Sequence, residues 1–245
     1  MAQTFAIDRV GLILTLCNDI DLIPGFYKSL VESMPVNYSY GLIAVDGGSY
    51  DGSVEAMKTC EVKGPFPDLS RALNEGIRMY MPCSKDVLIR QYGEVPNKSD
   101  SFDYICWIHP DMKFPMEGWL PKLVAHLKAH PEIGKLAPEL TQYQNHPTLG
   151  DRDGNQCPWI MPTTALRKIE KDHKWFDENF CGIGGMEDWD INKRIMAAGM
   201  KVSIVHSVVV EHTGMGTRAK KDTNLDALHN RRYFEQKWGN TQCPV

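Results

Sequence analysis

The sequence predicts an α/β protein with a mostly parallel central sheet flanked by helices and a less regular C-terminal half. Short apolar runs alternate with stretches of helical spacing from Val10 to Leu140. This alternation is typical of a parallel sheet whose connecting helices cover its faces. Continuous apolar runs, such as Val10–Leu16, indicate strands that are buried on both faces.

The first half contains the more regular elements. Val10–Leu16 is predicted as a buried strand, and Tyr38–Val45 is predicted as a second strand that stops at Asp46-Gly47-Gly48-Ser49. Glycines there let the backbone turn tightly and approach a ligand. The other expected elements are a helix at Ile23–Met34, a helix at Asp51–Thr59, an amphipathic helix at Asp68–Met81, a polar loop at Pro82–Asp100, a strand at Phe102–Ile108, a helix at Glu117–His130 and a strand at Gly134–Leu140.

The second half is richer in loops. Its Gly, Pro, Asp and Asn content interrupts the periodic segments more often. The expected elements are a polar loop at Gln142–Pro158, a short segment at Trp159–Pro162, a helix at Thr163–Ile169, a glycine-rich stretch at Phe176–Met186, a helix at Glu187–Ala198, a strand at Lys201–Val210 and a C-terminal helix at Asp222–Trp238.

Composition excludes several classes of protein. The hydrophobic fraction of 42% and the charged fraction of 24% are ordinary for a globular protein, and the formal net charge of −4 gives no strong positive field for nucleic acid or membranes. The seven cysteines are irregularly spaced and include no Cys-x-x-Cys pair, which argues against a zinc knuckle or a disulfide framework. Reduced thiols and a cytoplasmic location are expected, and we find no transmembrane or secretory segment.

Polar residues follow four of the predicted strands. Ligands of open parallel sheets bind beyond the carboxyl ends of the strands, so polar residues there are the better candidates for a site. Their order along the chain suggests one site that collects groups from several strands. These residues are Asn18, Asp46, His109, Asp111, Glu211 and His212.

Three of these residues suit a metal ion. His109 and Asp111 are two residues apart and can reach one cation if the chain between them turns, and His212 could supply a third ligand. Imidazole and carboxylate ligands with open positions suit a divalent metal, Mn²⁺ or Mg²⁺, which would hold a diphosphate. The alternative is that the two histidines only form hydrogen bonds with the backbone at strand ends.

An acidic pair follows the glycine-rich stretch. Glu187 and Asp188 begin a predicted helix, where the helix dipole and free N–H groups favour negative charge. That alone explains them structurally. The functional interpretation is that one carboxylate acts as a general base toward an acceptor hydroxyl. Trp159, Trp175 and Trp189 are either core residues or stacking platforms near such an acceptor.

Together these segments resemble the family-2 glycosyltransferases of the GT-A fold, over about Val10 to Trp238. The family's first strand is matched by VGLILTLCND, and its VVDDGSTDGT signature by LIAVDGGSYDGS. Its ArNrGi helix is matched by LSRALNEGI, and the strand carrying its Asp-x-Asp motif by DYICWIHPDMKF. Its FDErf.g.gEDvDlclRl..aGy.v segment is matched by FDENFCGIGGMEDWDINKRIMAAGMKV, and its vvHhg ending by VVVEHTG.

The resemblance implies a Rossmann-like GT-A domain that spans residues 1–245. A nucleotide-sugar-binding half would cover about 1–140, and an acceptor and catalytic half would cover 141–245. Asp46 would contact the donor base, expected to be uracil, and Arg71 would approach the nucleotide. The remaining donor contacts implied are Leu16, Cys17, Asn18, Pro110, Asp111, Arg218 and Lys220.

The resemblance also implies an inverting, metal-dependent transferase that uses a nucleotide-diphospho-sugar. Asp111 and His212, with His109, would bind the metal. Asp188 would be the catalytic base, with Glu187 beside it orienting the acceptor or the loop. The acceptor stays open between a glycan, a small molecule, a protein, a lipid-linked sugar and a modified nucleic-acid base.

Three positions depart from the family pattern. His109 stands where the first acidic residue of Asp-x-Asp is expected, Gly47 replaces the second Asp of the signature, and Cys17 replaces an aromatic residue. Two alternatives therefore stay open: a non-catalytic relative that binds a nucleotide sugar, and a sugar-phosphate nucleotidyltransferase. The second lacks support in Cys17–Asp21, which is acidic where a basic glycine-rich phosphate loop is expected.

Overall fold

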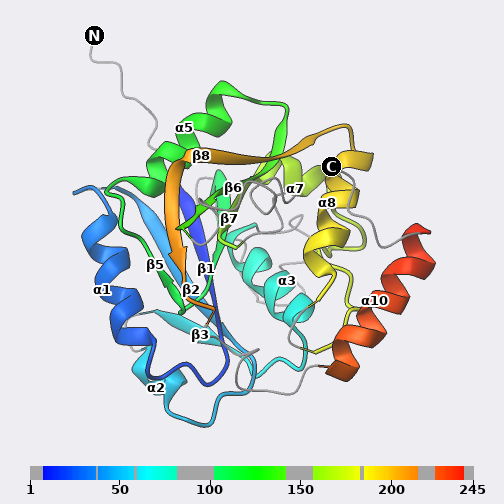
Figure 1. Cartoon of the computed structure of the whole chain (residues 1–245), viewed down its shortest axis with the longest axis horizontal. Helices are drawn as coiled ribbons and strands as arrows, with labels where there is room; N and C mark the ends of the chain where they lie inside the picture. The colour runs from blue at the N-terminus through cyan, green and yellow to red at the C-terminus, as the bar shows by residue number, and fades with distance from the viewer. Residues whose placement is uncertain are drawn as a thin grey trace, which may run out of the picture.

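The computed structural model describes residues 8–36, 38–57, 60–81, 102–141, 157–182, 185–214 and 224–239. Figure 1 shows a central sheet with helices on both sides. The strands are β1 (Val10–Leu16), β2 (Tyr40–Asp46), β3 (Glu61–Lys63), β4 (Tyr104–Ile108), β5 (Met112–Lys113), β6 (Ile133–Leu140), β7 (Trp159–Pro162) and β8 (Lys201–His212). The helices are α1 (Ile23–Ser33), α2 (Ser53–Ala56), α3 (Leu69–Tyr80), α5 (Trp119–Ala129), α7 (Thr163–Ile169), α8 (Glu187–Ala197) and α10 (Asn224–Trp238).

The described strands form one sheet in the order β3-β2-β1-β4-β7-β6-β8-β5. Strands β3, β2, β1 and β4 are parallel, and β8 is parallel to β6. Strand β7 is antiparallel to both β4 and β6, so it joins the two parallel sets. The sheet is therefore mostly parallel, as predicted, and the carboxyl ends of β1, β2 and β4 meet at one edge.

Two observed strands were not predicted, and the predicted strands differ from the observed ones by at most two residues at either end. Strands β3 and β5 were not expected, because three and two residues are too few to show a periodicity. Strand β8 continues to His212, two residues beyond the predicted end at Val210, because its last residues pair with β5. The predicted loop at 82–100 and most of the loop at 142–158 lie outside the described residues.

The helices form a layer on each face of the sheet (Figure 1). Helices α1 and α5 share one face, where the Trp119 indole N–H donates to the Ser33 hydroxyl at 3.1 Å. Helices α3 and α8 lie on the other face, and α10, red in Figure 1, lies outside α8. Within the part of the chain that is described, no helix has the length and hydropathy to cross a membrane.

Glycines allow α3 to approach β1 closely. A Cβ on Gly76 would lie 2.7 Å from the Ile13 side chain, and one on Gly11 would lie 2.5 Å from the Tyr80 ring. No side chain fits in either place. The Tyr80 hydroxyl also donates to the Leu12 carbonyl at 3.1 Å, so helix and strand are fixed in register.

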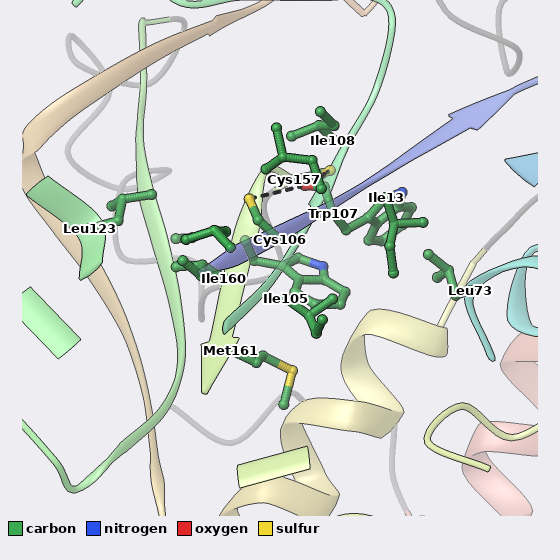
Figure 2. Close-up of a cluster of buried hydrophobic side chains, with 14 of the residues drawn as sticks. Ile13, Leu73, Ile105, Cys106, Trp107, Ile108, Leu123, Cys157, Ile160 and Met161 are labelled. Carbon is green, nitrogen blue, oxygen red and sulfur yellow. Dashed lines mark hydrogen bonds between the residues drawn. The ribbon is translucent and has the colours of Figure 1, made fainter. Parts of the chain in front are cut away.

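A single apolar core runs through both halves of the sheet. Figure 2 shows its centre, where Trp107 of β4 lies among Cys106, Cys157 and Ile160. The Cys157 thiol donates to the Trp107 carbonyl at 3.4 Å. Because β7 bridges β4 and β6, these side chains join the first half of the chain to the second.

Strand β8 carries an irregularity in the middle of its pairing with β6. Val205 is opposite Pro138, but the next matched pair is Val209 with Glu139, so residues 206–208 are extra in β8. Such a bulge bends a strand and increases its twist. The bend lets β8 leave β6 and pair with β5, which places Met112 opposite His212.

Candidate functional site

Two loops interlock at the edge where β1 and β2 end. The Asn18 N–H donates to the Ser49 hydroxyl at 3.0 Å, and the Asn18 carbonyl oxygen Oδ1 accepts from the Tyr50 N–H at 2.9 Å. The Asp19 N–H donates to the Ser53 hydroxyl at 2.8 Å. The chain after β1 is thus held by side chains of the segment after β2, and Asn18 keeps its left-handed φ of 60°.

Asp51 completes this contact. Its carboxylate accepts from the Ile20 N–H at 3.0 Å and from the Ser53 hydroxyl at 2.6 Å. Slight burial opposes ionisation, but these hydrogen bonds outweigh it and lower the pKa of Asp51 below its ordinary value. The charged form of Asp51 therefore stabilises the shape of the predicted donor-binding loops.

Asp46 lies at the end of β2 and is buried. Its carboxylate stabilises the tight turn that follows the strand. Its oxygens accept from the Gly48 N–H at 2.9 Å and from the Ser49 N–H at 3.1 Å. Its backbone carbonyl accepts from the Phe66 N–H at 2.8 Å. Asp46 thus holds together the segments that begin and end the β2–α3 connection, and its predicted contact with a donor base stays a prediction.

The neighbouring predicted donor residues lie at the same edge. The Leu16 carbonyl accepts from the Gly47 N–H at 2.8 Å, and the Cys17 thiol is 3.7 Å from the Gly47 carbonyl. Arg71 begins α3 with half of its side chain exposed, and its Nε is 3.2 Å from Asp68 Oδ2. The guanidinium is exposed to solvent, and a ligand phosphate could take the place of Asp68 in this ion pair.

A chain of polar side chains links β1 to His109. The Trp107 indole N–H donates to the Thr15 hydroxyl oxygen at 3.1 Å, and that oxygen is 2.7 Å from His109 Nδ1. The Trp107 and His109 rings also meet edge to face, with centroids 4.7 Å apart. These contacts orient the His109 imidazole at the end of β4 and direct Nδ1 toward Thr15.

Asp111 and His212, which the sequence predicted as ligands of one metal ion, are in contact with each other. Asp111 follows β4, and β5 pairs with the end of β8, so His212 Nε2 lies 3.1 Å from Asp111 Oδ1. The Asp111 backbone carbonyl also accepts from the Thr213 N–H at 2.9 Å and from its hydroxyl at 3.1 Å. The Asp111 side chain is 5% exposed, so this carboxylate is nearly buried.

The three predicted metal ligands do not close around one point. The His109 and His212 rings are parallel within 5°, with centroids 6.1 Å apart. Among the described residues, no three His, Cys, Asp or Glu side chains are arranged to hold a metal ion alone. The Asp111 oxygen and the His212 nitrogen still suit a divalent ion, since Mg²⁺ is usually held by one or two protein carboxylates and by substrate phosphates.

Asp188 lies on the first turn of α8 and faces β7 and β6. The Trp159 indole N–H donates to Asp188 Oδ1 at 3.1 Å. The Lys135 ammonium, on β6, is 3.7 Å from the same oxygen. About a fifth of the Asp188 side chain is exposed, at 19%, so its carboxylate is partly accessible.

Glu187 has a different environment. Its side chain is buried, and Oε2 accepts a hydrogen bond from the Gly185 N–H just before the helix. A carboxylate in the first turn that accepts from a preceding N–H stabilises the start of its own helix. Of the two acidic residues, Asp188 is the more accessible to an acceptor.

Cys157 is a buried thiol whose pKa is affected by both predicted carboxylates, Asp111 on the metal side and Asp188 on the base side. Burial raises its pKa well above the ordinary value, and the charges of Asp188 and Asp111 raise it further, while Lys135 opposes them. One buried thiol is therefore within electrostatic reach of both predicted carboxylates. Strand pairing supports the same proximity: Trp159, which donates to Asp188, is opposite Trp107 on β4, the strand that leads to Asp111.

The other predicted residues have mixed outcomes. Pro110 is buried between His109 and Asp111. Arg218 and Lys220 lie outside the described residues. Trp159 and Trp175 are 0% and 1% exposed, so the core interpretation holds for both.

Sequence analysis missed Lys135 and Thr15. Lys135 stands inside the apolar strand Ile133–Leu140, and a lysine in a strand buried along its whole length needs a partner. A lysine within an apolar strand could therefore have been noticed from the sequence. Thr15 gave none, because a threonine in a β-strand is ordinary.

Comparison with known proteins finds similarity in structure but not in sequence: no protein-family model and no curated protein matches the chain. A mannosyltransferase from Pyrobaculum calidifontis, solved with GDP-Man and Mn²⁺, is similar with a TM-score of 0.66 and 15% identity. The match covers 100% of this chain and 69% of that chain.

Two further solved structures show the same likeness. Glucosyl-3-phosphoglycerate synthase from Mycobacterium tuberculosis, in complex with Mn²⁺, UDP and glucosyl-3-phosphoglycerate, has a TM-score of 0.59 at 14% identity, covering 100% of this chain and 88% of that one. S. aureus TarS has a TM-score of 0.60 at 13% identity, covering 94% of this chain and 39% of that one. This chain has the GT-A fold that the sequence predicted.

Proposed function

We propose that this protein is an inverting glycosyltransferase that moves a sugar from a nucleoside diphosphate to an acceptor hydroxyl. The observation that carries the proposal is that two carboxylates lie beside adjacent strands: Asp111 follows β4, and Asp188 accepts a hydrogen bond from Trp159 of β7, which pairs with β4. Asp111 contacts His212, as a metal-binding carboxylate would, and Asp188 is partly exposed, as a general base must be.

Asp111 and His212 are the residues that would hold a divalent metal, with His109 beside them. Such an ion, when bound, stabilises the negative charge of a departing diphosphate. Two of the three similar proteins described above were solved with Mn²⁺, which supports this assignment. The nucleotide itself would lie over the interlocked loops around Asn18 and Asp46, with Arg71 at one side.

Asp188 would take the acceptor proton. The acceptor oxygen attacks the anomeric carbon, the bond from that carbon to the diphosphate oxygen breaks, and the proton passes to the Asp188 carboxylate. A single displacement of this kind inverts the anomeric configuration. Glu187 and the helix start would fix where Asp188 stands relative to the acceptor.

We propose a UDP-sugar as the donor, on the resemblance of the first half to family-2 enzymes. The similar structures bind different bases, GDP-Man in one and UDP in the other, so the fold alone does not select the base. Their acceptors are likewise their own, and the acceptor class of this chain stays open.

The donor site is tested by thermal unfolding with UDP, GDP, CDP or dTDP, with and without Mn²⁺. A ligand that binds only the folded state raises the midpoint, by roughly 5 °C or more at about 100 times Kd. We expect the largest shift with UDP and Mn²⁺, and its loss when EDTA is added or when Asp111→Asn is introduced.

Asp103→Asn is the matched control, because Asp103 lies at the opposite end of β4, where its carboxylate accepts a hydrogen bond from the Arg9 N–H. It should leave the nucleotide shift unchanged. A preference for GDP would correct the base and keep the enzyme class. No Mn²⁺-dependent shift with any of the four nucleotides would remove the proposed donor site.

A further inference from the structure

Lys135 is the buried cation of the site. It lies on β6 between Leu136 and Gly134, and its side chain is 0% exposed. Burying an ammonium is costly unless an opposite charge and hydrogen bonds compensate it. The sequence around it is otherwise apolar, so the compensation comes from other elements of the fold.

Asn192, Asp188 and Trp159 are among the described side chains near the ammonium. Lys135 Nζ donates to Asn192 Oδ1 at 2.9 Å and is 3.7 Å from Asp188 Oδ1. It also lies 5.1 Å from the centre of the Trp159 ring, a distance at which a cation interacts with an aromatic face. Asp188 and Asn192 are four residues apart on α8, so one face of that helix presents both to Lys135.

Two of these neighbours also contact each other. The Trp159 indole N–H and the Lys135 ammonium both approach Asp188 Oδ1, from β7 and from β6. The carboxylate is therefore fixed against two strands of the sheet by a donor and by a charge. This arrangement restricts rotation of the carboxylate and stabilises its ionised form.

We propose that Lys135 is the positioning residue of the catalytic base: its buried ammonium keeps Asp188 ionised and holds the carboxylate in the orientation that faces the acceptor. This inference rests on the proposed function, since it assigns Asp188 as the base. Lys135 does not touch the reacting atoms and acts through Asp188.

The pairing has a consequence for turnover. When Asp188 takes the acceptor proton, the buried ammonium loses its counter-charge, and the protonated state becomes less favourable. Lys135 thereby favours transfer of that proton from Asp188 to water once the product leaves. The Asp188 carboxylate is then ionised at neutral pH and can take a proton from the next acceptor. The same ammonium makes Asp188 a somewhat weaker base.

The other groups near Asp188 do not replace this charge. The Cys157 thiol lies beside it, and burial raises the pKa of that thiol, so it stays neutral at neutral pH. The charge of Asp111, which like that of Asp188 raises the pKa of Cys157, is negative and does not replace an ammonium. Asn192 and Trp159 are uncharged. Among the described neighbours, Lys135 supplies the positive charge.

The test is a carboxyl ¹³C NMR titration of Asp188, assigned by the signal that disappears in Asp188→Asn. In Lys135→Met, the titration midpoint of Asp188 should rise by about one pH unit or more, because an opposite charge at this distance has been removed. Lys201→Met is the matched control: its side chain is 70% exposed on the neighbouring strand, and the midpoint should stay in place. An unchanged midpoint in Lys135→Met overturns the inference.

A second measurement covers the case in which Lys135→Met folds poorly. The single variants Lys135→Met and Asp188→Asn each leave one partner of the pair behind, whereas the double variant removes both charges. If the two side chains interact, the loss in Tm of the double variant should be smaller than the sum of the losses of the two single variants. Additive losses in Tm would show that the two side chains do not interact, and would also overturn the inference.

Release of nucleoside diphosphate from UDP-glucose and GDP-mannose separates the two proposals. If wild type releases none and Asp188→Asn behaves identically, the proposed function fails, while the titration still reports on the pair. If wild type is active, Lys135→Met should lower kcat with KM for the donor unchanged, and should move the acidic limb of the pH profile upward. An active wild type with an unmoved limb contradicts the role of Lys135 alone.

Discussion

Asn74 uses its whole amide to hold a distant loop. Its Oδ1 accepts from the Trp175 and Phe176 N–H groups at 2.9 and 2.8 Å. Its Nδ2 donates to the Phe176 carbonyl and to Glu178 Oε1, each at 3.0 Å. The side chain is fully buried, so α3 carries a polar clamp for the segment that leads to α8 and the predicted base.

Replacing Asn74 by Leu should lower the free energy of unfolding by about 3 kcal/mol, because several buried partners lose their hydrogen bonds at once. Urea unfolding measures the change. Asn179→Ala is the control: Asn179 is exposed on the same segment, and its loss should stay within about 0.5 kcal/mol. Equal effects of the two variants would refute the clamp.

The sequence patterns were a better guide to which strand ends carry candidate site residues than to the contacts that each side chain makes. Asp111 and His212 were predicted as ligands of one metal ion from their places at strand ends, and they lie 3.1 Å apart, although their binding of a metal stays a prediction. The predicted ligand His109 is turned toward Thr15, which no spacing rule could indicate, because the contact joins residues 94 apart. Lys135 could have been found, since a lysine within an apolar strand conflicts with its surroundings.

At the scale of elements, helix α10 contacts α8 and the loop before it through Lys237. Lys237 Nζ is 2.6 Å from Asp177 Oδ2 and 2.7 Å from Asp190 Oδ1, so it bridges the loop before α8 and the first turn of α8. The Trp238 indole N–H donates to the same Asp190 oxygen at 2.8 Å. The last turn of α10 therefore supports the helix that carries Asp188.

Lys237→Met should lower the free energy of unfolding at pH 7 by about 3 kcal/mol, since Asp190 is left as a buried charge with less compensation. Arg231→Met on the same helix removes an exposed ion pair with Glu235 and should cost at most about 0.5 kcal/mol. Thermal or urea unfolding of both variants checks this, and similar losses would contradict it.

The difference between wild type and Lys237→Met should depend on pH. Burial opposes ionisation of Asp177, but Lys237, the Asn179 N–H and the Tyr233 hydroxyl outweigh it and lower the pKa of Asp177 from 3.8 to about 2. A depressed folded-state pKa contributes stability above the unfolded value and loses it as pH falls. The gap between the two proteins should therefore narrow between about pH 4 and pH 2.

Most element boundaries were predicted to within two residues. The strand Val10–Leu16 and the helix Thr163–Ile169 were predicted with the bounds observed. Strand β5 has two residues and exists only because the end of β8 lies beside it. Its formation depends on a tertiary contact, and that same contact brings His212 to Asp111.

For the whole molecule, the two predicted halves share one core. Buried side chains from Val10 in β1 to Val210 in β8 form a single cluster. Strand β7, from the second half, pairs with β4 of the first half and with β6. The boundary at about residue 140 therefore separates only the predicted functional roles of the two halves. We expect the protein to unfold as one cooperative unit.

Hydrogen exchange in increasing urea tests that expectation. Ile13→Ala in β1 and Leu136→Ala in β6 each remove a fully buried side chain, and each should cost about 3 kcal/mol. In one cooperative unit, either change lowers the protection of the β1 amides and the β6 amides by the same amount.

Val36→Ala is the control, since Val36 is 90% exposed and packs against little. It should leave the protection of both strands unchanged. If Ile13→Ala lowers protection in β1 but not in β6, the donor side and the base side open independently. Closure of one side onto the other would then be available as a step in catalysis, and the coupling of Lys135 to Asp188 would belong to the base side alone. Equal losses in both strands mean instead that the site is built on one rigid sheet, with Asp111 and Asp188 held at a fixed separation before any ligand binds.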